Sequence, residues 1–300
     1  MDGDVSTDPQ PMHCLMCNGE RHRVVFTELG TDILRCTSCG HVFSSFRPDP
    51  HYSEYWGDEV PVGEHYYWSK ARARMHRDFS ERFIAGRSGR LLDMGCGLGF
   101  FLKAMAPYQD WDSYGCEISP AAVRHAQEHL GLRNVICSPL EDADLPRDYF
   151  DIVTMWDVLD HIPHPDPVIE HCHALLKDGG VLFIRTPNVS TQLLRSRIMQ
   201  KLQPDQRHLF ATDHPHFYSM RSVRMLLKRN GFTSVGFIHL HPIGSVSGTG
   251  WKAAVVGPLK TMSFHVLRAL AVSTGGHLNF DNLFVVAHKR VAATSPSRAQ

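Results

Sequence analysis

Three glycines at alternate positions, Gly95, Gly97 and Gly99, follow an apolar run that ends with Asp93 and Met94. Glycine adopts positive φ angles at no steric cost, and it has no Cβ atom to keep a ligand away from the backbone. The GxGxG spacing differs from the GxGxxG pattern of loops that bind the pyrophosphate of a dinucleotide. The loop therefore favours a ligand with an adenosyl group and no pyrophosphate.

A carboxylate ends the next apolar run. This run reaches from Ser113 to Glu117, and Ser119 and Pro120 then supply an N-cap and a first-turn proline for a helix. The carboxylate of Glu117 can accept hydrogen bonds from both hydroxyls of a ribose. Because ligands of open α/β sheets bind beyond the carboxyl ends of the strands, we expect the glycine loop and Glu117 to face one cleft.

Two CxxC pairs near the N-terminus, Cys14 with Cys17 and Cys36 with Cys39, have the spacing of the two knuckles of a zinc ribbon. Four thiolates complete a tetrahedral zinc site and leave no position for a substrate or a water molecule. We therefore expect a structural zinc ion that takes no part in chemistry. The alternative is a set of redox-active thiols, which the symmetric pairing disfavours.

The balance of charges limits the partners of the chain. Lys and Arg number 31 and Asp and Glu also number 31, so the overall positive charge of a non-specific nucleic-acid binder is missing. We recognise no signal peptide at the N-terminus. We also recognise no membrane span, because charged residues interrupt the most apolar late stretch, 253–272. The four remaining cysteines are scattered along the chain, which fits a protein of the reducing cytoplasm better than one held together by disulfides.

The elements that must position these residues begin at Arg90, where short apolar runs start to alternate with helical patterns. This alternation predicts an α/β fold with a parallel sheet covered on both faces. The predicted organisation is a disordered segment 1–12, a zinc ribbon 13–47, an α/β domain 48–291 with an insertion at 242–279, and a disordered tail 292–300.

The insertion contains apolar residues at helical spacing, namely Leu259, Met262, Val266, Leu267 and Leu270. Such a stripe can simply pack on the domain. The alternatives are a substrate lid or a contact with a lipid-linked acceptor, because insertions at this place in the fold carry substrate-specific elements.

Taken in order, these features resemble the class I S-adenosylmethionine-dependent methyltransferases over residues 66–290. LLDMGCGLGFFL is similar to their first motif, and FDIVTMWDVLDHIPHP is similar to the motif at their fourth strand. RTPN and HPHFYSMRSVRMLLKRNGF resemble the branch with ubiquinone-type O-methyltransferases and bacterial sugar or natural-product methyltransferases. The cysteine-rich module resembles zinc ribbons fused to bacterial methyltransferases. The resemblance implies a Rossmann-like, seven-stranded and mostly parallel sheet with an antiparallel last strand.

The resemblance also implies S-adenosylmethionine as cofactor and a set of residues that bind it. These are Asp93, Gly95, Gly97, Gly99, Glu117, Ile118, Leu140, Glu141, Trp156 and Asp157. Asp93 and the glycines would line the methionyl end, and Glu117 would hold the ribose. Ile118 would flank the adenine, while Trp156 and Asp157 would lie near the sulfonium. The aromatic run 66–68 either covers the cofactor or packs against the sheet.

Transfer of the methyl group to a hydroxyl would benefit from a general base, and histidine is the usual choice. His161 is the first candidate because it follows the fourth strand, and His214 and His216 come next. Together with Asp213 these histidines raise the alternative of a catalytic metal, although their spacing matches no recognised pattern.

The function that we expect is O-methylation of a small-molecule acceptor, such as a sugar, a phenol or an intermediate of secondary metabolism. One alternative is an RNA methyltransferase whose ribbon grips the substrate, which the neutral overall charge disfavours. Another is a non-catalytic module that retains the cofactor fold. The oligomeric state stays open.

Overall fold

The computed structural model describes residues 12–46, 67–243, 262–263, 265–270, 272–274 and 282–291. The two segments predicted to be disordered lie outside the described residues, apart from Met12, which packs against the core. Tyr66 and most of the predicted insertion also lie outside them. Among the described residues, no helix is both long enough and apolar enough to cross a membrane.

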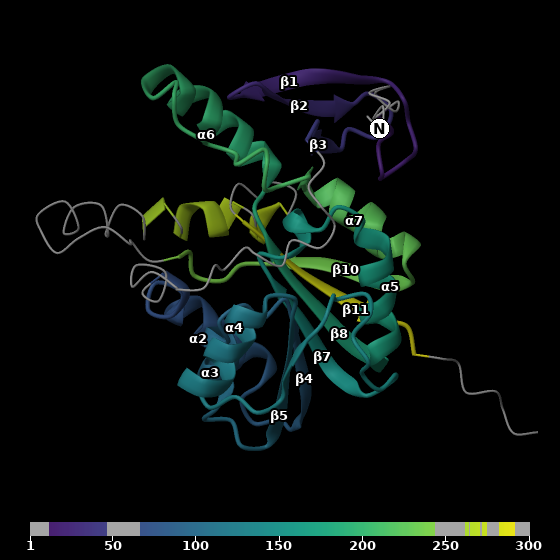
Figure 1. The fold of residues 1–300 in the computed structure, drawn as a ribbon, viewed down its shortest axis with the longest axis vertical. Helices are drawn as coiled ribbons and strands as arrows, with labels where there is room; N and C mark the ends of the chain where they lie inside the picture. The colour runs from purple at the N-terminus through teal and green to yellow at the C-terminus, as the bar shows by residue number, and fades with distance from the viewer. Residues whose placement is uncertain are drawn as a thin grey trace, which may run out of the picture.

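A seven-stranded mixed sheet lies at the centre of the α/β part (Figure 1). In order across the sheet, its strands are β10 (Phe232–Ile238), β11 (Leu283–Lys289), β8 (Leu176–Thr186), β7 (Phe150–Trp156), β4 (Gly89–Met94), β5 (Trp111–Glu117) and β6 (Val135–Cys137). Neighbouring strands from β8 to β6 are parallel, whereas β11 runs antiparallel to both β8 and β10. The predicted sheet, mostly parallel with an antiparallel last strand, is therefore confirmed.

Helices cover both faces of this sheet (Figure 1). On one face lie α2 (Ala73–Phe83), α3 (Phe100–Met105) and α4 (Pro120–Arg124), which continues as the π-helix η1 (His125–His129). On the other face lie α5 (Pro165–Leu175) and α7 (Met220–Arg229). Side chains alternate between the faces along each strand, so Leu91 of β4 joins one core cluster and Leu92 joins the other.

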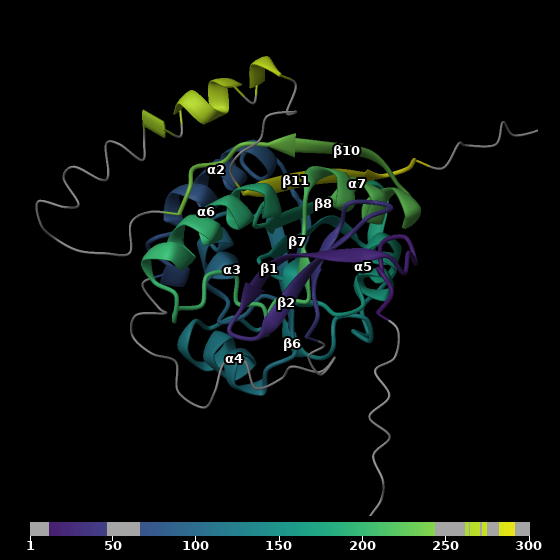
Figure 2. The same cartoon turned by 90° about the horizontal axis from the view of Figure 1, so that it is seen from above.

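A smaller antiparallel sheet contains the N-terminal strands β1 (His22–Glu28), β2 (Thr31–Cys36) and β3 (Val42–Ser44). Its fourth strand, β9 (His216–Phe217), comes from the α/β part and pairs with β3. Figures 1 and 2 show this sheet beside α6 (Val189–Leu202), above one end of the larger sheet. The N-terminal residues 13–46, which we call the ribbon, are thus joined to the α/β part through a shared sheet.

The apolar stripe of the insertion can be followed at several positions. The side chains of Met262, Val266 and Leu270 are exposed, and Leu267 is half-buried, whereas Leu259 lies outside the described residues. Three of the four described side chains of the stripe are therefore largely open to solvent.

Candidate active site

A cavity opens at the carboxyl ends of β4, β5 and β7. All the residues predicted to bind the cofactor line it, with the exception of Gly99. Those that line it are Asp93, Gly95, Gly97, Glu117, Ile118, Leu140, Glu141, Trp156 and Asp157. The glycine loop and the carboxylate at the end of β5 therefore face one cleft.

Glu117 is buried and holds the glycine loop in place. Its Oε2 atom accepts a hydrogen bond of 2.8 Å from the main-chain N–H of Gly97, and its Oε1 atom accepts one of 3.0 Å from Ser119. Burial raises the pKa of Glu117, although these N–H groups oppose the shift. A carboxylate oxygen can accept two hydrogen bonds, so each oxygen retains capacity for a ligand hydroxyl.

The glycines of the loop have positive φ angles, of 74° at Gly95, 52° at Gly97 and 82° at Gly99. A Cβ atom on Gly99 would lie 2.6 Å from Leu132 and 3.0 Å from Ala126. Gly99 therefore lets the loop pack closely against the helical layer and does not line the cavity. A side chain there would combine backbone strain with overpacking.

Asp93 lies at the buried base of the cavity. Thr154 Oγ1 donates a hydrogen bond of 2.7 Å to its Oδ1 atom. Burial raises the pKa of Asp93 to about 8, and the charge of Glu117 adds to the shift. The carboxyl group is thus protonated at pH 7 in the ligand-free protein, and a cation placed against it would favour its ionised form.

Two buried arginines hold Asp157. Arg72 Nη2 lies 2.6 Å from Asp157 Oδ2, and Arg185 Nη1 contacts Asp157 Oδ1. The guanidinium of Arg72 lies over Trp68, with its central carbon 3.9 Å from the ring centre, and both residues line the cavity. Both guanidinium groups thus contact the same carboxylate, and Arg72 is the one of the two that lines the cavity.

Arg72, Arg185 and His76 are not among the residues predicted from the sequence. Arg72 and His76 line the cavity. Burial, assisted by the charge of Arg72, lowers the pKa of His76 to about 3, so its ring is neutral at pH 7. The signal for Arg185 is a charged residue directly after the apolar run 181–184. Nothing in the sequence separates Arg72 from the other arginines around the start of α2.

His161 lies at the wall of the cavity, in the 3-10 helix η2 (Leu159–His161) that follows β7. Its Nδ1 atom lies 3.1 Å from the main-chain oxygen of Asp213. A carbonyl oxygen only accepts hydrogen bonds, so Nδ1 carries the proton and the lone pair of the neutral ring is on Nε2. Burial lowers the pKa of His161, although the charge of Asp160 opposes the shift. The imidazole is therefore a neutral proton acceptor.

The two other candidate histidines do not line the cavity. The ring centre of His214 lies 4.4 Å from that of His161, and its Nε2 atom lies 3.6 Å from Asp160 Oδ2. His216 is buried in β9, and its Nε2–H donates a hydrogen bond of 3.0 Å to the main-chain oxygen of Pro163. These two side chains contact residues of the cavity wall from the side away from the cavity, His214 at His161 and His216 at Pro163.

The metal-binding alternative involved His161, Asp213, His214 and His216. The structure brings only two of these side chains together, because the carboxylate of Asp213 pairs with Arg207 and His216 is directed toward the ribbon. Ligand-type atoms of Asp160, His161 and His214 do lie within 4.8 Å of one another. Within this cluster His214 Nε2 lies 3.6 Å from Asp160 Oδ2.

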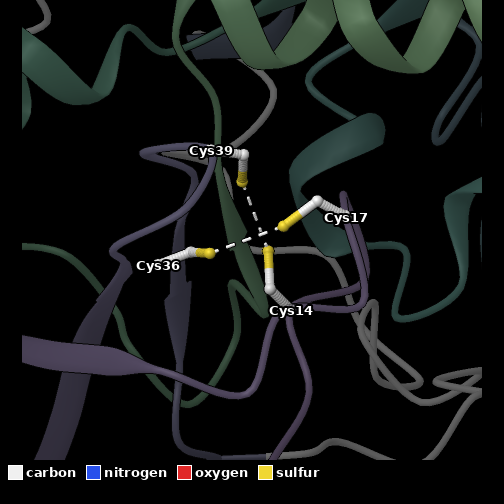
Figure 3. Close-up of side chains that lie close together, drawn as sticks. All are labelled: Cys14, Cys17, Cys36 and Cys39. Carbon is white, nitrogen blue, oxygen red and sulfur yellow. Dashed lines mark hydrogen bonds between the residues drawn. The ribbon is translucent and has the colours of Figure 1, made fainter.

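The four thiols predicted to bind zinc converge on one point (Figure 3). The Sγ atoms of Cys14 and Cys39 lie 3.6 Å apart, and those of Cys17 and Cys36 lie 3.5 Å apart. In a tetrahedral site with Zn–S bonds of about 2.3 Å, the sulfur atoms lie about 3.8 Å from one another. The two separations are close to this value, and the four thiols form a cluster that could hold a zinc ion.

Comparisons with known proteins show the family of the chain. A family model described as a methyltransferase domain matches residues 48–235. A ubiquinone biosynthesis O-methyltransferase of Coxiella burnetii is 26% identical over 176 residues, which cover 55% of this chain and 73% of that protein. A protein of the same description from Alkalilimnicola ehrlichii is 33% identical over 119 residues, which cover 37% of this chain and 47% of that protein.

A solved structure shares the fold. It is an S-adenosylmethionine-dependent methyltransferase of Thermotoga maritima, described as a possible histamine N-methyltransferase. The TM-score is 0.51 at 16% identity, and the match covers 76% of this chain and 94% of that one. At this identity the likeness shows the α/β fold alone.

Proposed function

The chain belongs to the methyltransferase domain family and is an S-adenosylmethionine-dependent methyltransferase, and on this premise we propose that it methylates an oxygen of a small metabolite. The acceptor is a sugar, a phenol or an intermediate of secondary metabolism. The relatives support oxygen as the acceptor atom, since they are described as O-methyltransferases. The observation that carries the proposal is the neutral imidazole of His161 at the wall of the donor cavity.

S-adenosylmethionine supplies a methyl group bonded to a positively charged sulfur, so its leaving group needs no further activation. Glu117 would hold the ribose through the acceptor capacity that Gly97 and Ser119 leave on its oxygens. Asp93 would face the positively charged end of the donor, where its ionised form is stabilised. The guanidinium of Arg72, which lines the cavity, would contact the methionyl carboxylate.

On the acceptor side, the chain has to hold the hydroxyl oxygen about 3 to 3.5 Å from the methyl carbon and in line with the carbon–sulfur bond. As the new carbon–oxygen bond forms, the hydroxyl proton becomes acidic. The Nε2 atom of His161 accepts this proton. The Nδ1 atom cannot accept it, because it already carries a proton and donates a hydrogen bond to the main-chain oxygen of Asp213. The pKa of His161, which burial lowers, keeps the ring neutral before the transfer.

We also propose that the four cysteines of the ribbon hold one structural zinc ion. The converging thiols support this assignment, and their number fills a tetrahedral site. Zinc bound in this way would supply folding free energy to the ribbon and no chemistry to the cavity.

The acceptor class is tested with methyl-labelled S-adenosylmethionine and separate pools of phenols, sugars and RNA. We expect label on a metabolite oxygen, and we expect His161→Ala to lower turnover by about 10²- to 10⁴-fold while donor affinity is retained. His129→Ala is the matched control, because this exposed histidine of η1 does not line the cavity. Label found only on RNA or on a nitrogen, or normal turnover by His161→Ala, would refute the proposal.

A further inference from the structure

The loop between α6 and β9, residues 203–215, has turns but no helix or strand of its own. It nevertheless forms the support behind the catalytic side of the cavity. The main-chain oxygen of Asp213 fixes His161 Nδ1, and the ring of His214 lies against that of His161. A loop without regular structure owes its position to its contacts, and here several of them come from the ribbon.

The main contact is made by Glu28, the last residue of β1. Its side chain is buried, and its carboxylate accepts three main-chain hydrogen bonds from the loop. The Oε1 atom accepts from His208 and, at 2.6 Å, from Leu209, while Oε2 accepts at 2.8 Å from Ala211. Hydrogen bonds to an ionised acceptor are about twice as strong as neutral ones, so this carboxylate clamps the loop firmly.

The neighbouring strand β3 adds a second contact. Ser44 Oγ donates a hydrogen bond of 2.6 Å to the main-chain oxygen of Ala211, and the Ser44 N–H donates one of 3.0 Å to Pro215. Since Ala211 is bonded on its N–H by Glu28 and on its oxygen by Ser44, the ribbon holds both sides of one residue. Only Thr212 separates Ala211 from Asp213, the partner of His161.

A third contact reaches the cavity wall itself. His216 Nε2 donates to the oxygen of Pro163, so its Nδ1 is the acceptor of the 3.0 Å hydrogen bond from His41 Nε2. Pro163 lines the cavity two residues after His161. Two independent routes therefore lead from the ribbon to the catalytic wall, one through the loop and one through β9.

We propose that the ribbon is a positioning element for methyl transfer, in which Glu28 and Ser44 hold the loop so that Asp213 keeps His161 in the Nδ1–H tautomer. Glu28 touches neither donor nor acceptor and acts only through the loop. The inference rests on the proposed role of His161, and it extends the ribbon beyond a structural zinc module. The position of the His161 ring matters because a misplacement of a catalytic group by about 1 Å can lower the rate by about 10²-fold.

The test is Glu28→Gln, which keeps the size of the side chain but directs an amide NH₂ group at a main-chain donor. Glu20→Gln is the matched control, since it makes the same change at an exposed position of the ribbon. Ser44→Ala is a milder second variant that removes one hydrogen bond to Ala211. Circular dichroism, zinc content and melting temperature establish that each variant is folded.

The readout is ¹⁵N NMR of histidine-labelled protein, with His161 assigned by its loss in His161→Ala. The groups facing this ring are Asp160, His214 and Asp213, the last through both its main-chain oxygen and its carboxylate. In the wild type and in Glu20→Gln we expect one Nδ1–H tautomer and a pKa below the ordinary value of about 6.5. In Glu28→Gln, and more weakly in Ser44→Ala, we expect mixed tautomers and a pKa closer to that value.

Donor affinity separates this inference from the proposed function. Calorimetry should give the same S-adenosylmethionine affinity for the wild type and Glu28→Gln within about two-fold, because the donor residues lie on β4, β5 and β7. With an acceptor in hand, turnover of Glu28→Gln should fall at least about ten-fold. A folded Glu28→Gln or Ser44→Ala protein with the wild-type His161 tautomer, pKa and turnover would overturn the inference. A wild type that binds no donor would instead refute the proposed function.

Discussion

The buried carboxyl group of Asp93 is placed where it can couple the binding of a cation to the release of a proton. In the ligand-free protein burial raises its pKa to about 8, so at pH 7 the carboxyl group is mostly protonated. S-adenosylmethionine brings an ammonium and a sulfonium, which favour the ionised carboxylate. We therefore expect binding at pH 7 to release up to about one proton, and the release to vanish above pH 9.

Calorimetric titrations at pH 7 in buffers of different ionisation enthalpy measure this proton release. The observed heat should vary with the buffer for the wild type and lose that dependence in Asp93→Asn. Asp110→Asn, which changes an exposed aspartate after α3, should behave as the wild type. A heat of binding that is independent of the buffer in the wild type would show that Asp93 does not ionise.

At this scale the sequence predicted residues whose place follows from a strand end. Asp93 is the penultimate residue of β4 and Glu117 is the last residue of β5, so a parallel sheet brings them to one edge whatever the side-chain packing. The ion cluster of Arg72, Asp157 and Arg185 was not predictable in this way. It depends on a side chain from before α2 reaching the end of β7, which is a property of tertiary packing.

The turn from β4 into α3 leaves no room for a side chain at Gly99. Gly99→Ala would place a methyl group 2.6 Å from Leu132 at a φ of 82°. We expect a loss of about 2 to 4 kcal/mol in the free energy of unfolding, from backbone strain plus overpacking. Chemical denaturation of the ligand-free protein measures it.

Gly131→Ala is the matched control for this substitution. Its φ is 71°, but a Cβ atom there meets nothing within 4 Å, so only the backbone strain of about 1 to 2 kcal/mol applies. Equal losses for the two variants would show that Gly99 is required for its backbone angle alone and not for close packing.

The strands and helices of the α/β part were predictable because each is an apolar run of the right period, bounded by turn residues. The short strand β9 was not, since two residues carry no period of their own. Its pairing depends on β3, which lies far away in the chain. The three hydrogen bonds to Glu28 were not predictable for the same reason. Nothing near a glutamate at the end of a strand indicates three N–H partners about 180 residues away.

For the whole molecule, the shared sheet and the Glu28 clamp make the ribbon part of a larger cooperative unit. Loss of zinc should therefore destabilise the entire described part and not only its N-terminal strands. We expect about one zinc ion per chain in the wild type, and in Cys39→Ser we expect loss of zinc with a melting temperature lower by about 5 to 10 °C.

Elemental analysis and a thermal melt followed by circular dichroism check this expectation. Cys137→Ser is the matched control, because Cys137 is an exposed cysteine at the end of β6, away from the cluster. A Cys39→Ser protein that keeps its zinc, or one that loses zinc and melts as the wild type does, would show that the metal does not support the fold.

We expect the glycine loop and Glu117 to bind S-adenosylmethionine in the cavity beyond β4, β5 and β7. The decisive measurement is isothermal titration of the metal-replete protein with S-adenosylmethionine. The wild type and Glu128→Gln, which changes an exposed glutamate of η1, should bind equally, and Glu117→Gln should bind about 10- to 100-fold more weakly. No heat and no thermal stabilisation with the wild type at millimolar donor, or equal affinity for Glu117→Gln, would contradict it.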